Sequence, residues 1–308
     1  MKIVFMGTPD FAVPTLDAIV NAGHDVICVV AQPDKPKGRG KQLVSPPTIQ
    51  RARELGLMTK QPKAVRRGPF VEWMKSCNAD LAVVVAYGRI LIKEVLEAPT
   101  LGCINVHASL LPKYRGAAPI HWSIINGDSQ TGVCTMQMDE GMDTGDVLLR
   151  RATDIHPQET TEMLWARLSN LGADLLIQTL DQLPNITPQA QDHPNATYAP
   201  LITKATGAID WNKSAFEIEC LVRGCISWPV SHTTFRDKTL KIWSVSTSES
   251  NISAQPGKVI GLRPLPVIAT GQGAIQLNEI QLPNKKRTRA DALVNGARLQ
   301  LGEILGDR

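Results

Sequence analysis

The first half of the chain alternates short apolar runs with longer amphipathic segments. Runs rich in β-branched residues predict buried strands at 2–6, 25–31, 81–86 and 103–107. The segments between them place apolar residues at helical spacing and predict helices at 11–22, 47–55, 70–76 and 92–98. Strands that are apolar on both faces and separated by helices are typical of an α/β fold with a doubly wound, mostly parallel Rossmann-like sheet.

The second half changes character after one more α/β stretch. A helix at 117–126, strands at 133–138 and 147–154, and a long helix at 160–183 continue the first pattern. Residues 184–203, PNITPQAQDHPNATYAPLIT, have no apolar period and predict a linker. A helix at 213–223 and short alternating strands then predict a small, OB-like β-barrel. We expect a first domain at 1–189, a linker at 190–207 and a second domain at 208–308.

Composition narrows the class of protein. The 308 residues are 43% hydrophobic and 20% charged, which is typical of globular proteins and excludes disorder as the main state. No run approaches the roughly 18 consecutive apolar residues of a membrane-spanning helix, so we expect a cytoplasmic protein without a membrane partner. The six cysteines form no CxxC pair and no Cys/His cluster, which predicts reduced thiols and no metal site.

The distribution of charge differs between the two parts of the chain. Residues 1–205 contain 20 Lys and Arg against 20 Asp and Glu, whereas residues 206–308 contain 13 against 9. The whole net charge of +4 therefore lies in the last third. This asymmetry favours an anionic partner for the second domain.

The turn after the first strand bears on cofactor use. It reads MGTPDF, with Gly7 as its one glycine, whereas a dinucleotide-binding turn needs G-x-G-x-x-G for close approach to a pyrophosphate. We therefore expect no nicotinamide or flavin dinucleotide.

The densest polar cluster follows the strand at 103–107, in the segment NVHASLLPKYRGAAP. Asn105 and His107 are two residues apart, so on a strand they face the same side. An amide donor beside an imidazole can hold a carbonyl oxygen and move a proton. Isolated residues of these types are usually structural, but the proline-bounded loop that follows has no core of its own and favours a site. Asp143, in the glycine-bracketed GMDTGD, is either a turn former or the carboxylate that orients His107.

These segments carry a resemblance to a known family. MGTPDF, QPDKPKGRGKQL, AYGRIL, INVHASLLPKYRGAAPI and DEGMDTGDVL resemble segments of the methionyl-tRNA formyltransferases in order and spacing, and GAIDW, SWPV, LKIW and LPNKKRTRADAL extend the resemblance over essentially the whole chain. The Asn-x-His motif with SLLPxxRG is shared by the wider group that uses 10-formyltetrahydrofolate. The basic GRGK loop and the second domain indicate the tRNA-specific family, although Ile92 stands where a proline is common.

The resemblance implies formyl transfer from 10-formyltetrahydrofolate, as co-substrate, to the α-amino group of methionyl initiator tRNA. It implies that Asn105 and His107 stabilise the oxygen of a tetrahedral intermediate and that Asp143 pairs with His107. The folate contacts that it implies are Ser109, Leu110, Leu111, Pro112, Tyr87, Gly88, Arg89, Ile90 and Leu91. Arg115 is left with two interpretations, substrate positioning or a salt bridge at the rim.

Two basic segments are candidates for binding tRNA. In Pro33–Ser45, cations alternate with other residues at Lys35, Lys37, Arg39 and Lys41. A solvated loop is the usual meaning of such a run, but its place after the second strand favours phosphate contacts. The resemblance makes Arg39 the central arginine of a tRNA-binding loop. Lys285, Lys286 and Arg287 form a second basic tip in the predicted barrel, and we expect the protein to be a monomer.

Other functions remain open at this point. The same fold can formylate a nucleotide-linked amino sugar or another small amine, such as a purine-precursor ribonucleotide, or hydrolyse the folate. From a different class, the chain would be a non-catalytic RNA-binding protein. The basic segments favour a polyanionic substrate over the small ones, and the presence of Asn105, His107 and Asp143 favours catalysis.

Overall fold

The computed structural model describes residues 1–37, 42–248 and 254–306, and the chain clusters into two compact units. The first unit consists of Met1–Pro119, Gln130–Asp154 and Trp165–Pro200. The second consists of Ile120–Ser129, Ile155–Leu164 and Leu201–Arg308. It thus takes two short segments from within the predicted first domain. No helix in the described ranges is long and apolar enough to cross a membrane.

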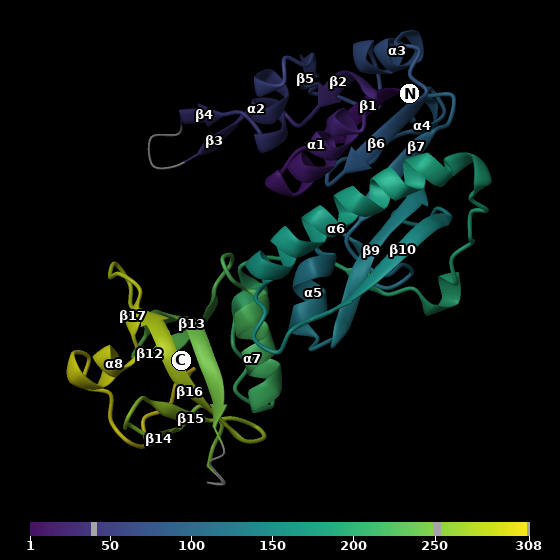
Figure 1. The fold of residues 1–308 in the computed structure, drawn as a ribbon. Coiled ribbons are helices and arrows are strands. Elements are labelled where there is room, and N and C mark those ends of the chain that lie inside the picture. The colour runs from purple at the N-terminus through teal and green to yellow at the C-terminus, as the bar shows by residue number, and fades with distance from the viewer. Residues whose placement is uncertain (38–41, 249–253, 307–308) are drawn as a thin grey trace. The chain divides into compact units, whose positions relative to one another are not determined.

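A seven-stranded sheet, counted over the described residues, forms the centre of the first unit (Figure 1), in the order β10-β9-β7-β6-β1-β2-β5. Its strands are β1 (Lys2–Gly7), β2 (Asp25–Val30), β5 (Thr59–Lys60), β6 (Leu81–Val85), β7 (Cys103–His107), β9 (Gln130–Gln137) and β10 (Val147–Asp154). The strands from β5 to β7 are parallel, and β9 and β10 add an antiparallel edge. The predicted doubly wound, mostly parallel sheet is confirmed.

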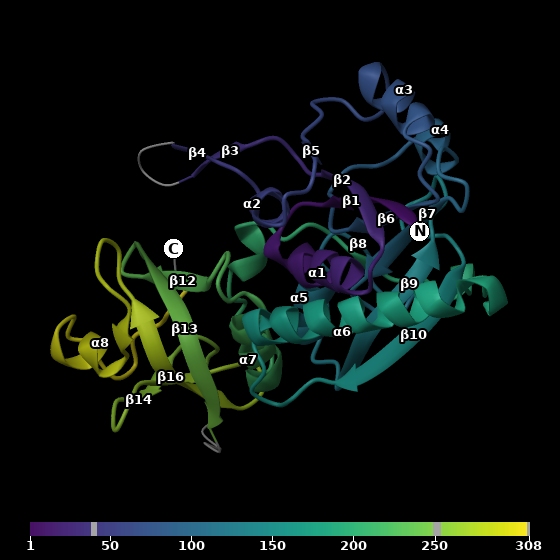
Figure 2. The ribbon, with the colours of Figure 1, turned by 45° about the horizontal axis from the view of Figure 1, so that its top comes forward.

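Helices cover both faces of this sheet because its strands are apolar on both sides. They are α1 (Val13–Asn21), α2 (Pro47–Glu54), α3 (Pro69–Ser76), α4 (Lys93–Leu96) and most of α6 (Thr161–Gln182), with 3-10 turns η1 (Asp10–Ala12), η2 (Leu183–Asn185) and η3 (His193–Asn195). Figure 2 shows α1 and α6 in front of the sheet. The ring centroids of Phe11, in η1, and Trp165, in α6, lie 5.1 Å apart. The other face packs on α3 and α4 through an apolar cluster that includes Met6, Met74, Val84, Leu96 and Cys103.

The path of the chain sets where a site can form. After β5 the chain crosses to the far side of β1 and continues with β6 and β7. The crevice at the carboxyl ends of β1 and β6 is therefore the switch point where open α/β sheets bind ligands.

Two small pairs of strands lie outside the main sheet. β3 (Lys35–Lys37) and β4 (Gln42–Val44) form a hairpin within the segment predicted as a loop. β8 (Arg115–Gly116) pairs in parallel with β11 (Tyr198–Ala199), so the chain returns after α6 to the loop that follows β7. The first half of the segment predicted as a linker is thus bound to the first unit, because its backbone pairs with β8.

The second unit is built on an antiparallel sheet in the order β12-β13-β16-β15-β14, with β17 paired to β16. Its strands are β12 (Ser231–Phe235), β13 (Lys238–Ser248), β14 (Val259–Gly261), β15 (Val267–Ala269), β16 (Ala274–Gln281) and β17 (Thr288–Arg289). Its helices are α5 (Pro119–Ile125, from Ile120), α7 (Ala215–Gly224) and α8 (Asp291–Asn295), preceded by η4 (Ala205–Gly207). The core joins α7 to the strands through residues such as Ile218, Val222, Ile242 and Leu277. The predicted small β domain is confirmed.

Candidate active site

Two polar side chains stand on a sheet face that is otherwise apolar. β7 is buried along its whole length. Its side chains alternate between the two faces of the sheet, so Cys103, Asn105 and His107 share one face. In the sheet, Asn105 lies between Val84 of β6 and Met136 of β9. Asn105 is 9% and His107 6% exposed, and the Asn105 amide has no side-chain hydrogen bond within the described part of the chain. Neither amide atom is fully buried, so this unpartnered amide is open to a ligand at the end of β7.

The two ring nitrogens of His107 face different polar groups. Its Nε2 lies 2.9 Å from the carbonyl oxygen of Tyr114. Because a carbonyl only accepts, Nε2 carries the proton and donates. Nδ1 lies 3.8 Å from Oδ2 of Asp143, which is too long for a hydrogen bond but within the range of an ion pair. Nδ1 can therefore take up a proton, and the carboxylate then stabilises the imidazolium.

Asp143 reaches His107 through a loop that folds back along β7. Met138 N donates to Cys103 O at the start of β7, whereas Asp143 lies beside His107 at its end. Asp143 has φ 53°, in the left-handed region that residues other than glycine rarely adopt. Its Oδ2 accepts a hydrogen bond of 2.7 Å from Gly116 N. Asp143 thus forms a turn and also presents its carboxylate to the histidine.

The two glycines that bracket Asp143 face different kinds of neighbour. A Cβ at Gly145 would lie 1.8 Å from the carbonyl oxygen of Gln137, and one at Gly141 would lie 1.9 Å from Oγ1 of Thr144. The obstacle at Gly145 is backbone, whereas the obstacle at Gly141 is the Thr144 side chain, whose hydroxyl can rotate. The loop conformation that carries Asp143 therefore depends most on Gly145.

The loop after β7 turns part of its predicted folate segment inward. Ser109 is fully buried and donates to Lys113 O at 2.5 Å. Leu111 joins the core with Cys134, Met136 and Val147. Leu110 and Pro112 are half-buried. Folate binding by this segment remains a prediction, for which backbone groups and the two half-buried side chains are available.

Arg115 lies under this loop, away from the rim. It is 2% exposed, and its Nε and Nη2 donate to Oε1 of Gln191 at 3.1 and 2.7 Å. Nη2 also lies 3.0 Å from Nδ1 of His193. A salt bridge at the rim is therefore wrong for Arg115, because its partners are a neutral amide and an imidazole. Gln191 was not predicted from the sequence, because it lies in a segment without periodicity.

The end of β6 lies at the switch point of the sheet. Tyr87 and Leu91 are buried, whereas Gly88, Arg89 and Ile90 reach the surface to differing extents. The Gln32 side chain donates to the carbonyl oxygens of Tyr87 and Gly88 at 3.0 and 3.2 Å. The Tyr87 hydroxyl is buried without a partner in the described chain, and burial raises its pKa to about 12.

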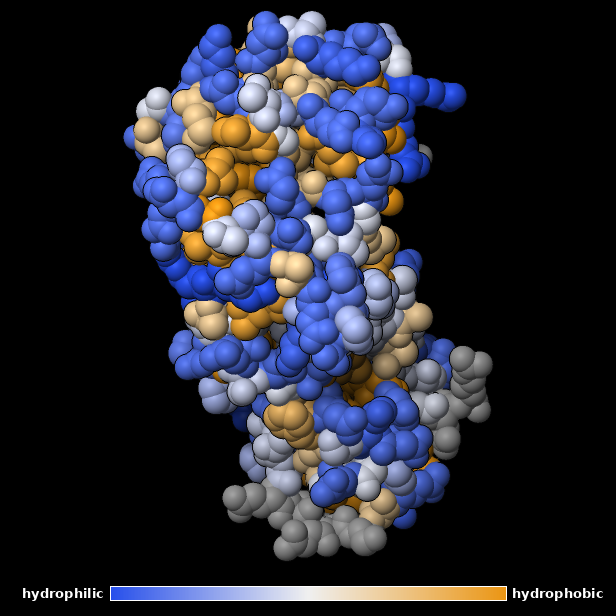
Figure 3. Space-filling view, turned by 90° about the vertical axis from the view of Figure 1, so that its right-hand side faces the viewer, coloured by the Kyte–Doolittle hydropathy of each residue, from blue (hydrophilic) through white to orange (hydrophobic). Residues whose placement is uncertain are grey.

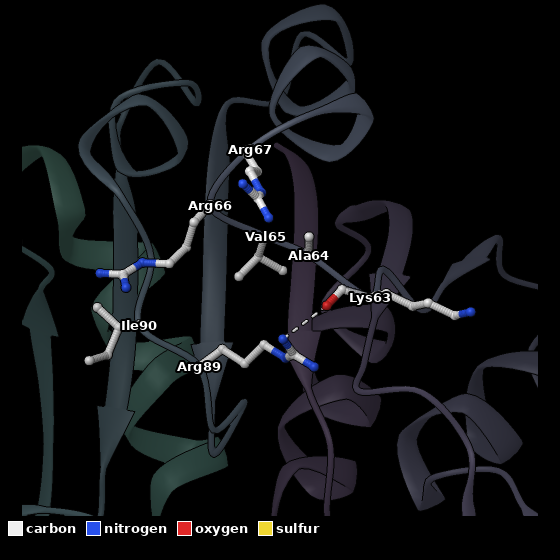
Figure 4. A pocket seen from close by; sticks show the side chains of 7 residues that line it. All are labelled: Lys63, Ala64, Val65, Arg66, Arg67, Arg89 and Ile90. Carbon is white, nitrogen blue, oxygen red and sulfur yellow. Dashed lines mark hydrogen bonds between the residues drawn. The ribbon is translucent and has the colours of Figure 1, made fainter.

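Beside this strand end is a cationic pocket of about 500 Å³ (Figure 4). It is lined by Lys63, Ala64, Val65, Arg66, Arg67, Arg89 and Ile90. Arg89 Nη1 donates to Lys63 O at 3.1 Å, and its Nε is buried without a partner in the described chain. None of the four cations forms an ion pair with any residue that the structure describes. Unneutralised guanidinium groups of this kind bind carboxylates or phosphates.

Only Arg89 and Ile90 of this pocket were predicted from the sequence. The sequence signal for the others is a short cationic cluster, KAVRRG, placed just before α3.

Figure 3 shows one face of the molecule, on which hydrophilic side chains surround exposed apolar ones in the first unit.

Comparison with known proteins identifies the family. The profile described as "Formyl transferase" matches residues 1–180, and the one described as "Formyl transferase, C-terminal domain" matches residues 201–298. The chain belongs to the formyl transferase family. Within this family it is 49% identical to a methionyl-tRNA formyltransferase of Solibacter usitatus, over 100% of this chain and 99% of the relative. It is 47% identical to one of Lachnospira eligens, over the full length of both.

Solved structures of other proteins share the fold at low sequence identity. The sugar 3N-formyl transferase WlaRD matches with a TM-score of 0.68 and 19% identity, over 93% of this chain and 99% of that one. An N-formyltransferase from Helicobacter canadensis matches with a TM-score of 0.67 and 17% identity, over 94% and 100%. At such identities the likeness concerns the fold alone.

The predicted tRNA contacts lie on exposed segments where the structure describes them. Lys35 is exposed on β3, which also contains Lys37, and Arg39 and Lys41 lie outside the described residues. In the second unit, Lys285 and Lys286 are exposed between β16 and β17. The neighbouring Arg287 is paired with Glu279 and lies 4.9 Å from the Trp243 ring, so part of its charge is neutralised.

We expect Gly145→Ala to displace the Asp143 loop, because the added methyl group would overlap the Gln137 carbonyl. A displacement of about 1 Å at a reacting group lowers turnover by about 100-fold. The measurement is kcat for formyl transfer, together with thermal unfolding to show that the fold persists. Gly261→Ala, where an added Cβ meets ordinary contacts of 3.4 Å, is the matched control. Normal kcat in Gly145→Ala would contradict the dependence of the loop on this glycine.

Proposed function

We propose that this protein transfers the formyl group of 10-formyltetrahydrofolate to the α-amino group of methionyl initiator tRNA, giving N-formylmethionyl-tRNA for translation initiation. The observation that carries the proposal is the Asn105 amide, which has no side-chain partner in the described chain and is open to a ligand beside the His107–Asp143 pair at the end of β7. The relatives at 47% and 49% identity over the full chain support the choice of substrate.

Asn105 is placed to bind the oxygen of the reacting formyl group. When the amine attacks the formyl carbon, a tetrahedral intermediate forms and negative charge develops on that oxygen. A fixed amide N–H in a water-poor site stabilises this charge and needs no reorganisation during the reaction. Asn105 meets these conditions, since its neighbours in the sheet are apolar.

His107 and Asp143 are better suited to the proton than to the oxygen. Both ring nitrogens already face other groups, the Tyr114 carbonyl and the Asp143 carboxylate. Nδ1 accepts the proton that the attacking amine releases, and Asp143 stabilises the resulting cation. The proton then passes to N10 of the folate as the bond from N10 to the formyl carbon breaks. The nucleophile belongs to the substrate, so the protein needs no nucleophilic side chain.

The cationic pocket supports a folate as formyl donor. The tail of a folate ends in glutamate carboxylates, which match the Arg66, Arg67 and Arg89 guanidinium groups in charge and geometry. The Arg89 Nε, buried without a partner in the described chain, is a donor available to such a ligand. Folinic acid and tetrahydrofolic acid are named as ligands in solved structures of the fold, from Helicobacter canadensis and from Aquifex aeolicus HypX.

A polyanionic acceptor fits the exposed cations better than a nucleotide-linked amino sugar does. Lys35 in the first unit and Lys285 and Lys286 in the second offer phosphate contacts that a small acceptor does not need. We assign catalysis to residues 1–189 and tRNA binding to 208–308, joined by 190–207. The proposal further places a monomeric enzyme in the cytoplasm, where charged tRNA is used.

Asn105→Ala is expected to lower kcat by about 100- to 1000-fold, because one donor to the developing oxyanion is lost. Asn105→Asp, which keeps the shape but not the N–H donor, should lose a similar factor. Single-turnover transfer to charged initiator tRNA measures both, and unchanged thermal unfolding shows that the fold is intact. Wild-type transfer to free methionine, or near-normal turnover in both variants, would contradict the proposal.

The double variant Arg66→Ser/Arg67→Ser is expected to raise KM for 10-formyltetrahydrofolate by about tenfold or more, because charge-assisted hydrogen bonds to the tail are lost. kcat should stay near the wild-type value, because the reacting groups are untouched. Lys75→Ser, an exposed cation on α3 outside the pocket, is the control. A rise in KM for tRNA alone would show that the pocket serves the other substrate.

Lys285→Ala/Lys286→Ala is expected to weaken tRNA binding and to reduce the dependence of log K on log salt by about one unit per lysine. Folate KM should be unchanged. The measurement is tRNA binding over a salt series, with Lys258→Ala, an exposed cation of the same unit, as control. An unchanged salt slope would remove these lysines from the tRNA contact.

A further inference from the structure

The side-chain amide of Gln191 connects three segments of the first unit. Its Oε1 accepts from Nε and Nη2 of Arg115 at 3.1 and 2.7 Å. Its Nε2 donates to the carbonyl oxygens of Asp143 and Gly145 at 2.9 and 2.7 Å. Both Gln191 and Arg115 are buried, at 5% and 2% exposure. We infer that Gln191 is a positioning residue that holds the Asp143 carboxylate in place for formyl transfer, an inference that rests on the proposed function.

Arg115 fixes which end of the Gln191 amide faces the Asp143 loop. A guanidinium group only donates, so the amide must turn its oxygen toward Arg115. Its two N–H groups are then directed at the loop, where each has a carbonyl acceptor. Turning the amide over would place N–H against N–H on one side and oxygen against oxygen on the other. The buried cation therefore sets the direction of the amide and adds no salt bridge.

The loop needs this support because its conformation is unfavourable in isolation. Asp143 has a positive φ of 53°, and such residues persist only where the surroundings hold them. Gln191 holds the main chain on either side of Thr144, and Gly116 N holds the carboxylate. Arg115 and Gly116 are adjacent in β8, so one short strand controls both attachments.

The same strand is tied to the segment that supplies Gln191. Arg115 N donates to Thr197 O at 2.8 Å, and Ala117 N donates to Ala199 O at 3.0 Å. Gln191 is thus anchored on the chain that leads into β11, and the contacts close into a ring of loops around Asp143. Since Asp143 Oδ2 already lies 3.8 Å from His107 Nδ1, a small shift of the loop separates the pair.

The test is Gln191→Glu. The variant keeps an oxygen that accepts from Arg115, but it replaces the Nε2 amide group by a second oxygen, which faces the carbonyl oxygens of Asp143 and Gly145. kcat is expected to fall by about 10- to 100-fold, with KM for both substrates within about twofold of wild type. The double variant Gln191→Glu/Asp143→Asn should be no slower than Asp143→Asn alone, because the two residues act through one carboxylate. Losses that multiply in the double variant would overturn the inference, as would a raised KM with unchanged kcat.

Hydrogen–deuterium exchange of residues 138–146 separates this inference from the proposed function. Exchange there should quicken in Gln191→Glu and in Gln191→Met. It should stay unchanged in Gln189→Ala, a control in the same segment as Gln191, because the exposed Gln189 side chain bonds to Arg150 of β10 and not to the Asp143 loop. If exchange quickens in the Gln191 variants but the wild-type protein fails to formylate methionyl-tRNA, the proposed function is rejected and the role of Gln191 in positioning the loop stands. Unchanged exchange in both Gln191 variants would reject the positioning role.

Discussion

The burial of two polar side chains at the end of β7 is the constraint around which the first unit is arranged. Asn105 and His107 occupy a sheet face whose other members are apolar, and polar groups in such surroundings lose their hydration. The cost is offset for His107 by groups from two loops, the Tyr114 carbonyl and the Asp143 carboxylate. Asn105 receives no such compensation within the described chain. Its amide is not fully buried and has no partner there, so it is available to a polar ligand.

The main elements of both units could be predicted from the sequence because each carries a local signal. Buried strands such as β6 and β7 are continuous apolar runs, and α6 has a sustained helical period. The pairing of Asn105 with His107 on one face follows from strand alternation alone. The glycines on either side of Asp143 limited its role to a turn former or the carboxylate that orients His107. Its distance from His107 could be obtained only from the structure.

What could not be predicted depends on contacts between distant segments. β8 and β11 are each two residues long, too short for any period, and they form only because they pair with each other. Gln191 lies in a proline-rich segment that is typical of a linker, and its burial follows from Arg115 and the Asp143 loop. The cationic pocket has a similar origin, since Arg66 and Arg67 join Arg89 only in three dimensions. The sequence left Arg115 between substrate positioning and a salt bridge at the rim, whereas the structure shows a buried donor to Gln191.

The pairing of β8 with β11 has a consequence for how the protein is made. Arg115 is synthesised 76 residues before Gln191, its partner. During translation the sheet of the first unit can collapse around β7 while the Asp143 loop still lacks its anchor. The proposed reaction centre is therefore completed only when the segment leading into β11 has left the ribosome. Nascent chains released before that point would contain the polar residues of β7 but not the ring of loops that orders them.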